Sequence, residues 1–112
     1  MTVASIHDQI VSQVASWEDV TTGPGRFGST RFLVGRRELG HLHGDSLLDL
    51  PLPPTRKKEL LEQSRVEQHR YTPEKSGWVS LRISDETDVE TAIELLREQH
   101  GRAMQRQSSA TA

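Results

Sequence analysis

Two histidines, His41 and His43, stand two positions apart in the segment GHLHGD. Residues two apart on a strand point to the same face of a sheet, so the two imidazoles are expected to lie side by side. Such a pair can bind a metal only with a third donor, for which His69, Asp45 and Glu67 are candidates. Three alternatives therefore stay open: a polar ligand pocket, a metal site, and histidines that only hydrogen-bond within the sheet.

A tryptophan adds to this chemistry in the segment SGWVSLRIS. The alternation of residues in this segment predicts a strand with one apolar face, made by Val79, Leu81 and Ile83. The opposite face carries Trp78, Ser80 and Arg82. A large ring turned away from the core requires an explanation, because such rings are usually covered. Trp78 either lines a ligand pocket with Ser80 and Arg82, or is covered by another part of the sheet or a second copy of the chain.

The glycines of GPGRFGSTRF have the spacing G-x-G-x-x-G, which occurs in nucleotide-binding loops. In a dinucleotide fold this turn follows a strand and opens a helix, so that helix amides face the phosphates. Here the pattern places the turn after a helix and before a strand. We therefore predict that residues 23–28 form a turn without affinity for nucleotides, in which the glycines let Phe27 and Phe32 pack close to the backbone.

Composition narrows the classes of partner. The chain has 112 residues, 14 basic and 16 acidic, with a net charge of -2 and no cysteine. This balance makes nucleic acid an unlikely partner, although the middle of the chain is richer in arginine and lysine than its ends. Disulfide and thiolate chemistry are excluded. No signal peptide or membrane span is recognisable, so we expect a cytoplasmic location without membrane contact.

Three helices are expected to position these groups. The first carries Val3, Ile6, Ile10, Val14 and Trp17 on one face and begins after Ser5, with Asp8 in its first turn. A short helix over TRKKELLEQS follows the prolines of the middle segment. The last helix begins with a capping box, Thr87 to Glu90, and is expected to bury Val89, Ile93 and Leu96 against the apolar face of GWVSLRIS. Residues 101–112 are predicted to be a disordered tail.

Strands complete the predicted fold. TRFLV, RELGHLH and SLLDL form a meander with hairpin turns at Gly35-Arg36 and Gly44-Asp45, and VEQHRY is an edge strand. The prediction is one α+β domain over residues 1–100, with an antiparallel sheet of four to five strands. The N-terminal and C-terminal helices pack on one face, and the short helix is inserted in the middle.

Four segments resemble the luciferase-like domain family of bacteria and archaea: GRFGSTRFLVG, RELGHLHGDSLLDLPLP, VEQHRYTPEKSGWVSLRI and AIELLREQH. The resemblance covers roughly residues 15–100, and its most specific elements are GHLHGD, Asp49-x-Pro51, Glu67-x-His69 and SGWVS. Most members are uncharacterised and share distant similarity with fungal luciferases. Those enzymes oxidise a polyphenolic pyrone with dioxygen and without a protein-bound metal or flavin. The chain lacks their membrane segment and much of their length, so light emission is not implied.

The functional expectation is the binding of a small aromatic or anionic ligand on the face opposite the helices. The candidate ligand-binding residues are His41, His43, His69, Trp78 and Arg82. A histidine acting as general base on a phenolic ligand, with Arg82 or a second histidine beside the resulting anion, would allow oxygen-dependent oxidation. No metal and no other cofactor are predicted. The alternative is a non-catalytic interaction module that forms a homodimer or binds a partner protein through Trp78 and the strand edge.

Overall fold

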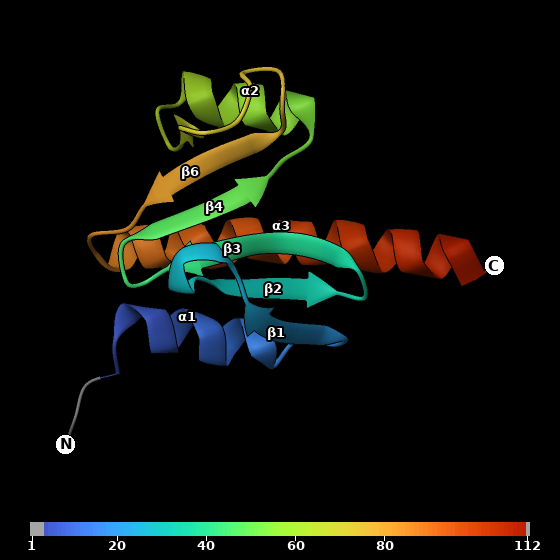
Figure 1. Ribbon diagram of the computed structural model, residues 1–112. Coiled ribbons are helices and arrows are strands. Elements are labelled where there is room, and N and C mark those ends of the chain that lie inside the picture. The colour runs from blue at the N-terminus through green and yellow to red at the C-terminus, as the bar shows by residue number, and fades with distance from the viewer. Residues whose placement is uncertain (1–3, 112) are drawn as a thin grey trace.

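A six-stranded antiparallel sheet, in the order β1-β2-β3-β4-β6-β5, is the framework of the molecule (Figure 1). The computed structural model describes residues 4–111. The α+β class is confirmed, and the strand that the sequence analysis did not identify is β1. In chain order the elements are α1 (Ile6–Ala15), β1 (Val20–Pro24), the 3-10 turn η1 (Arg26–Gly28), β2 (Thr30–Val34), β3 (Arg37–His43), β4 (Leu47–Pro51), α2 (Pro54–Glu62), β5 (Glu67–Gln68), β6 (Trp78–Arg82) and α3 (Glu86–Thr111).

The core lies between the sheet and its helices. α3 runs across one face of the sheet and packs on β2, β3 and β6, while α1 packs on α3 and β1 (Figure 1). Fully buried side chains from both layers fill this space: Ile10, Val14, Phe32, Leu39, Leu42, Leu48, Leu50, Val79, Leu95 and Leu96. The opposite side of the sheet is not covered by α1 or α3, and we call it the open face. Among residues 4–111, no helix is both long and apolar enough to cross a membrane.

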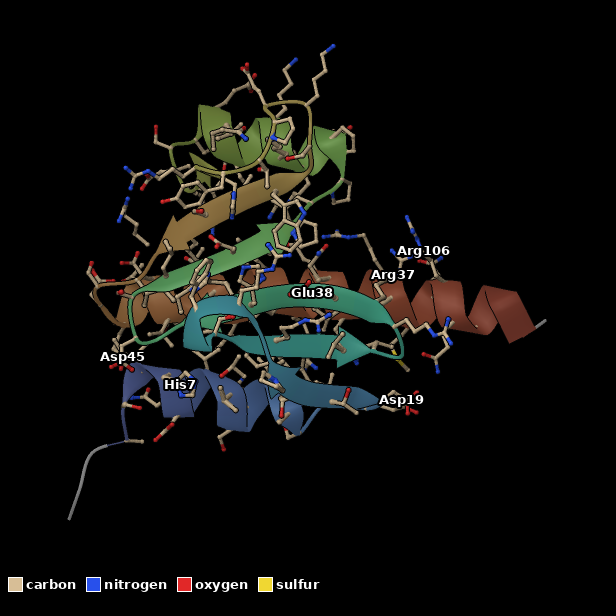
Figure 2. The ribbon with its side chains drawn as sticks, viewed as in Figure 1. His7, Asp19, Arg37, Glu38, Asp45 and Arg106 are labelled. Atoms are coloured by element: carbon tan, nitrogen blue, oxygen red, sulfur yellow. The ribbon has the colours of Figure 1, made fainter. Side chains whose placement is uncertain are left out.

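The first helix forms as its pattern predicts. Ser5 caps α1 by accepting a hydrogen bond from the Asp8 backbone N–H, and Ile10 and Val14 are buried. Val3, which the pattern assigns to the same face, lies outside the described residues. Near its N-terminus, α1 is tied to the β3–β4 turn, because the His7 backbone N–H donates to Asp45 at 2.7 Å (Figure 2). This bond fixes Asp45 at the edge of the fold.

The glycine segment joins two strands. β1 and β2 form an antiparallel hairpin with Gly23 opposite Arg31, and η1 is its tip. As expected, residues 23–28 do not open an α-helix, but the turn begins only at Gly25, because Gly23 and Pro24 still pair with β2. The expected packing of Phe27 is wrong: its ring is 95% exposed, at a positive φ of 58°, while Phe32 is fully buried. Lack of nucleotide affinity remains a prediction.

A bulge in β3 changes which side chains share a face. Phe32 pairs with Gly40 and Leu33 pairs with Glu38, so that Leu39 is an extra residue opposite the β2 strand. Both Leu39 and Gly40 are buried on the helix side. An added Cβ at Gly40 would lie 2.8 Å from the Asp49 carbonyl oxygen and 3.4 Å from a methyl of Leu96, so only glycine fits here without a shift. The bulge reverses the alternation, and Glu38 emerges on the open face (Figure 2).

The middle helix anchors the loop that precedes β6. Pro54 stands in the first turn of α2, as expected. Lys57 is buried, and its ammonium group donates to the backbone carbonyls of Glu74 and Ser76. These bonds hold residues 74–76 next to the strand that begins at Trp78. The same helix is joined to α3 by the paired hydrogen bonds from Arg56 to Glu98 at 2.9 and 2.8 Å.

The last helix begins earlier and continues further than its sequence signals predict. Its cap is Asp85, which accepts from the Asp88 backbone N–H, and not Thr87. Val89 and Leu96 are buried as expected, whereas Ile93 is only partly buried and Leu95 is fully buried. The predicted disordered tail is not observed, because α3 continues past Gly101 to Thr111. Burial of Ala103 against the core stabilises this extension.

Replacing Gly101 by alanine tests that extension. An added Cβ at Gly101 meets nothing within 4 Å. Since alanine is favoured over glycine in a helix interior, we expect the free energy of unfolding to rise by about 0.5–1 kcal/mol. Urea denaturation measures the change, and Gly40→Ala is the matched control in which the same substitution should destabilise. An unfolding free energy unaffected by Gly101→Ala would indicate that the helix ends before this position.

Candidate functional site: a histidine cluster on the open face

Strand register places polar residues in one row across the open face. Arg31 of β2 pairs with His41 of β3, which pairs with Asp49 of β4, which pairs with Ser80 of β6. Ser80 in turn pairs with Glu67 of β5. Paired residues have their side chains on the same face of a sheet, about 5 Å apart. Five neighbouring strands therefore present polar groups to each other in the part of the sheet that the helices leave uncovered.

Three imidazoles gather around one carboxylate in this row. Asp49 Oδ2 lies 3.1 Å from His43 Nε2, 3.2 Å from His69 Nε2 and 3.3 Å from His41 Nε2. The second oxygen, Oδ1, accepts a hydrogen bond from Ser80 Oγ at 2.6 Å. The Asp49 side chain is 5% exposed, while the imidazoles retain 13% to 28% exposure. We call His41, His43, His69 and Asp49 the histidine cluster.

The charges of the cluster follow from these contacts. Burial acts to raise the pKa of Asp49, but the bonds from His41 and Ser80 and the charge of His69 outweigh it and lower the pKa to about 2. The Asp49 carboxylate, with Glu38, raises the pKa of His41 against the opposing effect of burial. His41 Nδ1 is 2.9 Å from Glu38 Oε1, so both of its ring nitrogens face carboxylate oxygens. Only the protonated imidazolium can donate to both.

The other two histidines differ in their second ring nitrogen. His69 Nδ1 accepts a hydrogen bond from the Tyr71 backbone N–H at 3.2 Å. A neutral His69 must therefore carry its proton on Nε2, the nitrogen that faces Asp49. His43 uses Nε2 for its hydrogen bond to Asp49, and a proton on that nitrogen leaves the Nδ1 lone pair available. His41 thus donates from both ring nitrogens, whereas neutral His43 and His69 share the Nε2–H form and differ in whether Nδ1 already has a hydrogen-bond partner.

Trp78 supplies the apolar part of the site. Its ring centroid lies 5.2 Å from that of His41 and 6.0 Å from that of His69. Val79 and Leu81 are buried on the helix side, which confirms that Trp78 projects to the open face. The aromatic surface and the polar cluster are therefore continuous. Two surface pockets, one beside Lys57 and Gly77 and the other beside Arg37 and Arg106, are lined by other residues. The imidazoles are partly exposed, so a ligand can reach them from solvent.

Comparison with known proteins places this arrangement in a family. A protein-family model described as Luciferase domain matches residues 36–99, more than half of the chain. The chain belongs to the luciferase domain family. The match extends from the start of β3 into α3, and it includes the whole histidine cluster together with Glu38, Trp78 and Ser80. No curated protein and no solved structure matches the chain.

The sequence candidates divide into two groups in this luciferase domain. His41, His43, His69 and Trp78 lie together, as described above. Arg82 lies on the same face, but its guanidinium binds Glu67 at 2.7 Å and is largely exposed. Of the possible third donors, His69 joins the histidine pair, whereas Asp45 accepts from α1 and Glu67 pairs with Arg82.

Two members of the site were not identified as functional from the sequence. Asp49 interrupts the apolar run SLLDL, and alternation places its carboxylate on the face opposite Leu48 and Leu50, which is the only signal that the sequence offers for it. Glu38 carries no comparable signal, because strict alternation from His41 would turn it to the helix side. Ser80 was expected beside Trp78, and its bond to Asp49 is the contact that the structure adds.

Proposed function

We propose that this luciferase domain binds a small aromatic or anionic molecule on the open face, over the histidine cluster and Trp78. The observation that carries the proposal is the convergence of three partly exposed imidazoles on the single buried carboxylate of Asp49. A buried carboxylate is costly unless it is paired, and apolar residues of similar size often stabilise a fold as well or better. Such a cluster is therefore better explained by function than by stability.

The two parts of the surface suit the two parts of such a ligand. The ring of Trp78 offers a face for an aromatic group, at a distance from His41 that lets one ligand contact both. His41 is held as a cation by Glu38 and Asp49, and a positive imidazolium attracts an anionic oxygen. A phenolate or an aromatic carboxylate combines both features. This is the substrate class that the geometry favours.

We extend the proposal to oxygen-dependent oxidation of a phenol. His43 is the best placed general base, because Nδ1 can accept a proton while Nε2 remains bonded to Asp49. His41, already protonated, would stay beside the resulting phenolate. One electron would then pass from the phenolate to dioxygen, which gives a phenoxyl radical and superoxide. Arg82 is less suited to the anion-binding role, since its guanidinium is paired with Glu67.

Histidine-detected NMR tests the binding step with a control inside the same spectrum. The chain has five histidines, and His7 and His100 lie outside the cluster, bonded to Thr30 and to the Glu18 carbonyl oxygen. Titration with 4-hydroxybenzoate, in the presence of a chelator, should shift the signals of the three cluster histidines and of Trp78. The His7 and His100 signals should stay in place. His43→Ala should weaken binding, whereas the matched variant His100→Ala should not.

Two results would contradict the proposed function. One is the absence of any shift with 4-hydroxybenzoate, phenol or acetate. The other is a shift of the cluster signals with protein concentration alone, which would favour the homodimer alternative. Consumption of dioxygen in the presence of a bound phenol tests the oxidation separately, because binding without consumption would retain the ligand site and exclude the reaction.

A further inference from the structure

We propose that His41, Asp49 and His69 also bind a divalent transition-metal ion. The inference goes beyond the proposed ligand binding: it concerns a different occupant of the histidine cluster and rests on donor geometry alone. The sequence analysis left a metal site open as an alternative but predicted no metal, and this proposal replaces that prediction. The third donor that the sequence could not locate is Asp49, together with His69 from the segment after β5.

The donor atoms have the spacing of a coordination shell. One ligand atom from each of His41, Asp49 and His69 lies within 4.8 Å of the other two. Asp49 Oδ2 is 3.3 Å from His41 Nε2 and 3.2 Å from His69 Nε2. Metal bonds of about 2.0–2.2 Å in a tetrahedral site imply ligand atoms about 3.3–3.6 Å apart. A small closure of the two imidazoles would complete the set.

Neighbouring side chains hold two of the donors in the orientation that a metal needs. Glu38 Oε1 lies 2.9 Å from His41 Nδ1, and a carboxylate on the far nitrogen is the usual support of a metal-binding histidine. Ser80 binds Oδ1 of Asp49, so that Oδ2 is the oxygen left facing the imidazoles. Strand pairing between β3, β4 and β6 fixes the backbone beneath both donors.

The donor set indicates which kind of ion would bind. Two imidazoles and one carboxylate suit zinc, iron or nickel, whereas calcium and magnesium prefer oxygen ligands. Three protein ligands leave at least one coordination position open, and the partial exposure of His41 and His69 gives a further ligand access to it. The cluster therefore has the form of an open site.

Metal binding would require the loss of the Nε2 proton of His41, with the Nδ1 proton retained toward Glu38, and one rearrangement at His69. His69 Nδ1 accepts from the Tyr71 backbone N–H, which places the imidazole proton on Nε2. Coordination through Nε2 moves that proton to Nδ1 and breaks the bond to Tyr71. The Tyr71 side chain is largely exposed, so its segment can shift without loss of core packing. The Tyr71 amide resonance is consequently a reporter of metal binding that does not depend on activity.

The experiment is a titration of the chelator-treated protein with Zn²⁺ by calorimetry and with Co²⁺ by visible absorption. We expect one ion per chain, cobalt absorption bands typical of nitrogen and oxygen ligands, and a shift of the Tyr71 amide resonance. His41→Ala and His69→Ala should abolish this binding. Glu38→Gln should weaken it by about 10–100-fold, as the loss of an outer carboxylate does elsewhere. The matched control His7→Ala should bind like the parent protein.

Several results would overturn the metal site: no zinc binding by the parent protein, unchanged affinity in His41→Ala or His69→Ala, or equal loss in His7→Ala. Melting curves recorded without metal show whether each variant is folded, and Glu38→Gln gives a test that leaves all three donors in place. Failure here is distinguishable from failure of the proposed function, because 4-hydroxybenzoate binding is measured with chelator and zinc binding without any organic ligand.

Discussion

Replacement of Leu96 by alanine is expected to lower the free energy of unfolding by about 2–5 kcal/mol. Leu96 is fully buried on α3, and it approaches β3 at the one position where a glycine allows close contact, Gly40. The neighbouring backbone is sheet and helix, so the space left by the missing methyl groups cannot collapse easily. Because a domain of this size has a stability of only about 5–10 kcal/mol, the loss is a large part of the total.

Ile93→Ala is the matched comparison for Leu96→Ala. Both residues lie on α3, but Ile93 is only partly buried, so its replacement should cost less. Chemical denaturation followed by far-ultraviolet circular dichroism gives both values. Equal costs, or a larger cost at Ile93, would contradict the way in which α3 is packed on the sheet.

Asp49→Asn is expected to remove about 2 kcal/mol of stability at neutral pH. The pKa of Asp49 falls from 3.8 to about 2 on folding, and each unit of such a shift corresponds to about 1.4 kcal/mol. Since the folded-state pKa is depressed, this stabilisation is fully present above pH 4. It is lost as the pH falls through 2. The variant should therefore show a weaker loss of stability between pH 4 and pH 2 than the parent protein.

Thermal melts across that range, recorded with a chelator present, measure the difference. The matched control is Glu74→Gln, which also removes one negative charge. Glu74 is exposed, and among the described residues it takes part in no ion pair. It should leave the acid transition unchanged. If Asp49→Asn and the parent protein lose stability in parallel, the carboxylate does not hold the charge that its three histidines imply.

The spacing of apolar residues predicted most of the helices and strands, because each of these elements buries one apolar face. The spacing of Ile10 and Val14, and the alternation that separates Trp78 from Val79, were sufficient for α1 and β6. The end of α3 was not predictable in this way. Its sequence after Gly101 is polar, and one small buried residue, Ala103, together with the preceding helix continues the structure.

The histidine cluster depended on the length of one turn. A two-residue turn at Gly44-Asp45 would pair His43 with Ser46 and place Leu48 opposite His41. The observed turn has three residues, so His43 pairs with Leu47 and His41 faces Asp49. The proximity of His69 depended further on the pairing of β5 with β6, which the sequence indicated only as an edge strand. Residue types therefore indicated that the histidines belong to a site, while the register between β3 and β4 determined that Asp49 is their partner.

The bulge in β3 gives the core one more side chain than regular pairing would allow. Leu39 is the extra residue, and it is buried among the core side chains. Deleting Leu39 would restore regular pairing with β2 and keep Glu38 opposite Leu33, two positions from His41 on the open face. Variants without Leu39 should thus keep both carboxylates beside His41 and lose the stability that burial of this leucine contributes. Regular pairing with Leu39 retained would instead turn Glu38 to the helix side, so strand length and the bulge together set the content of the core and of the open face.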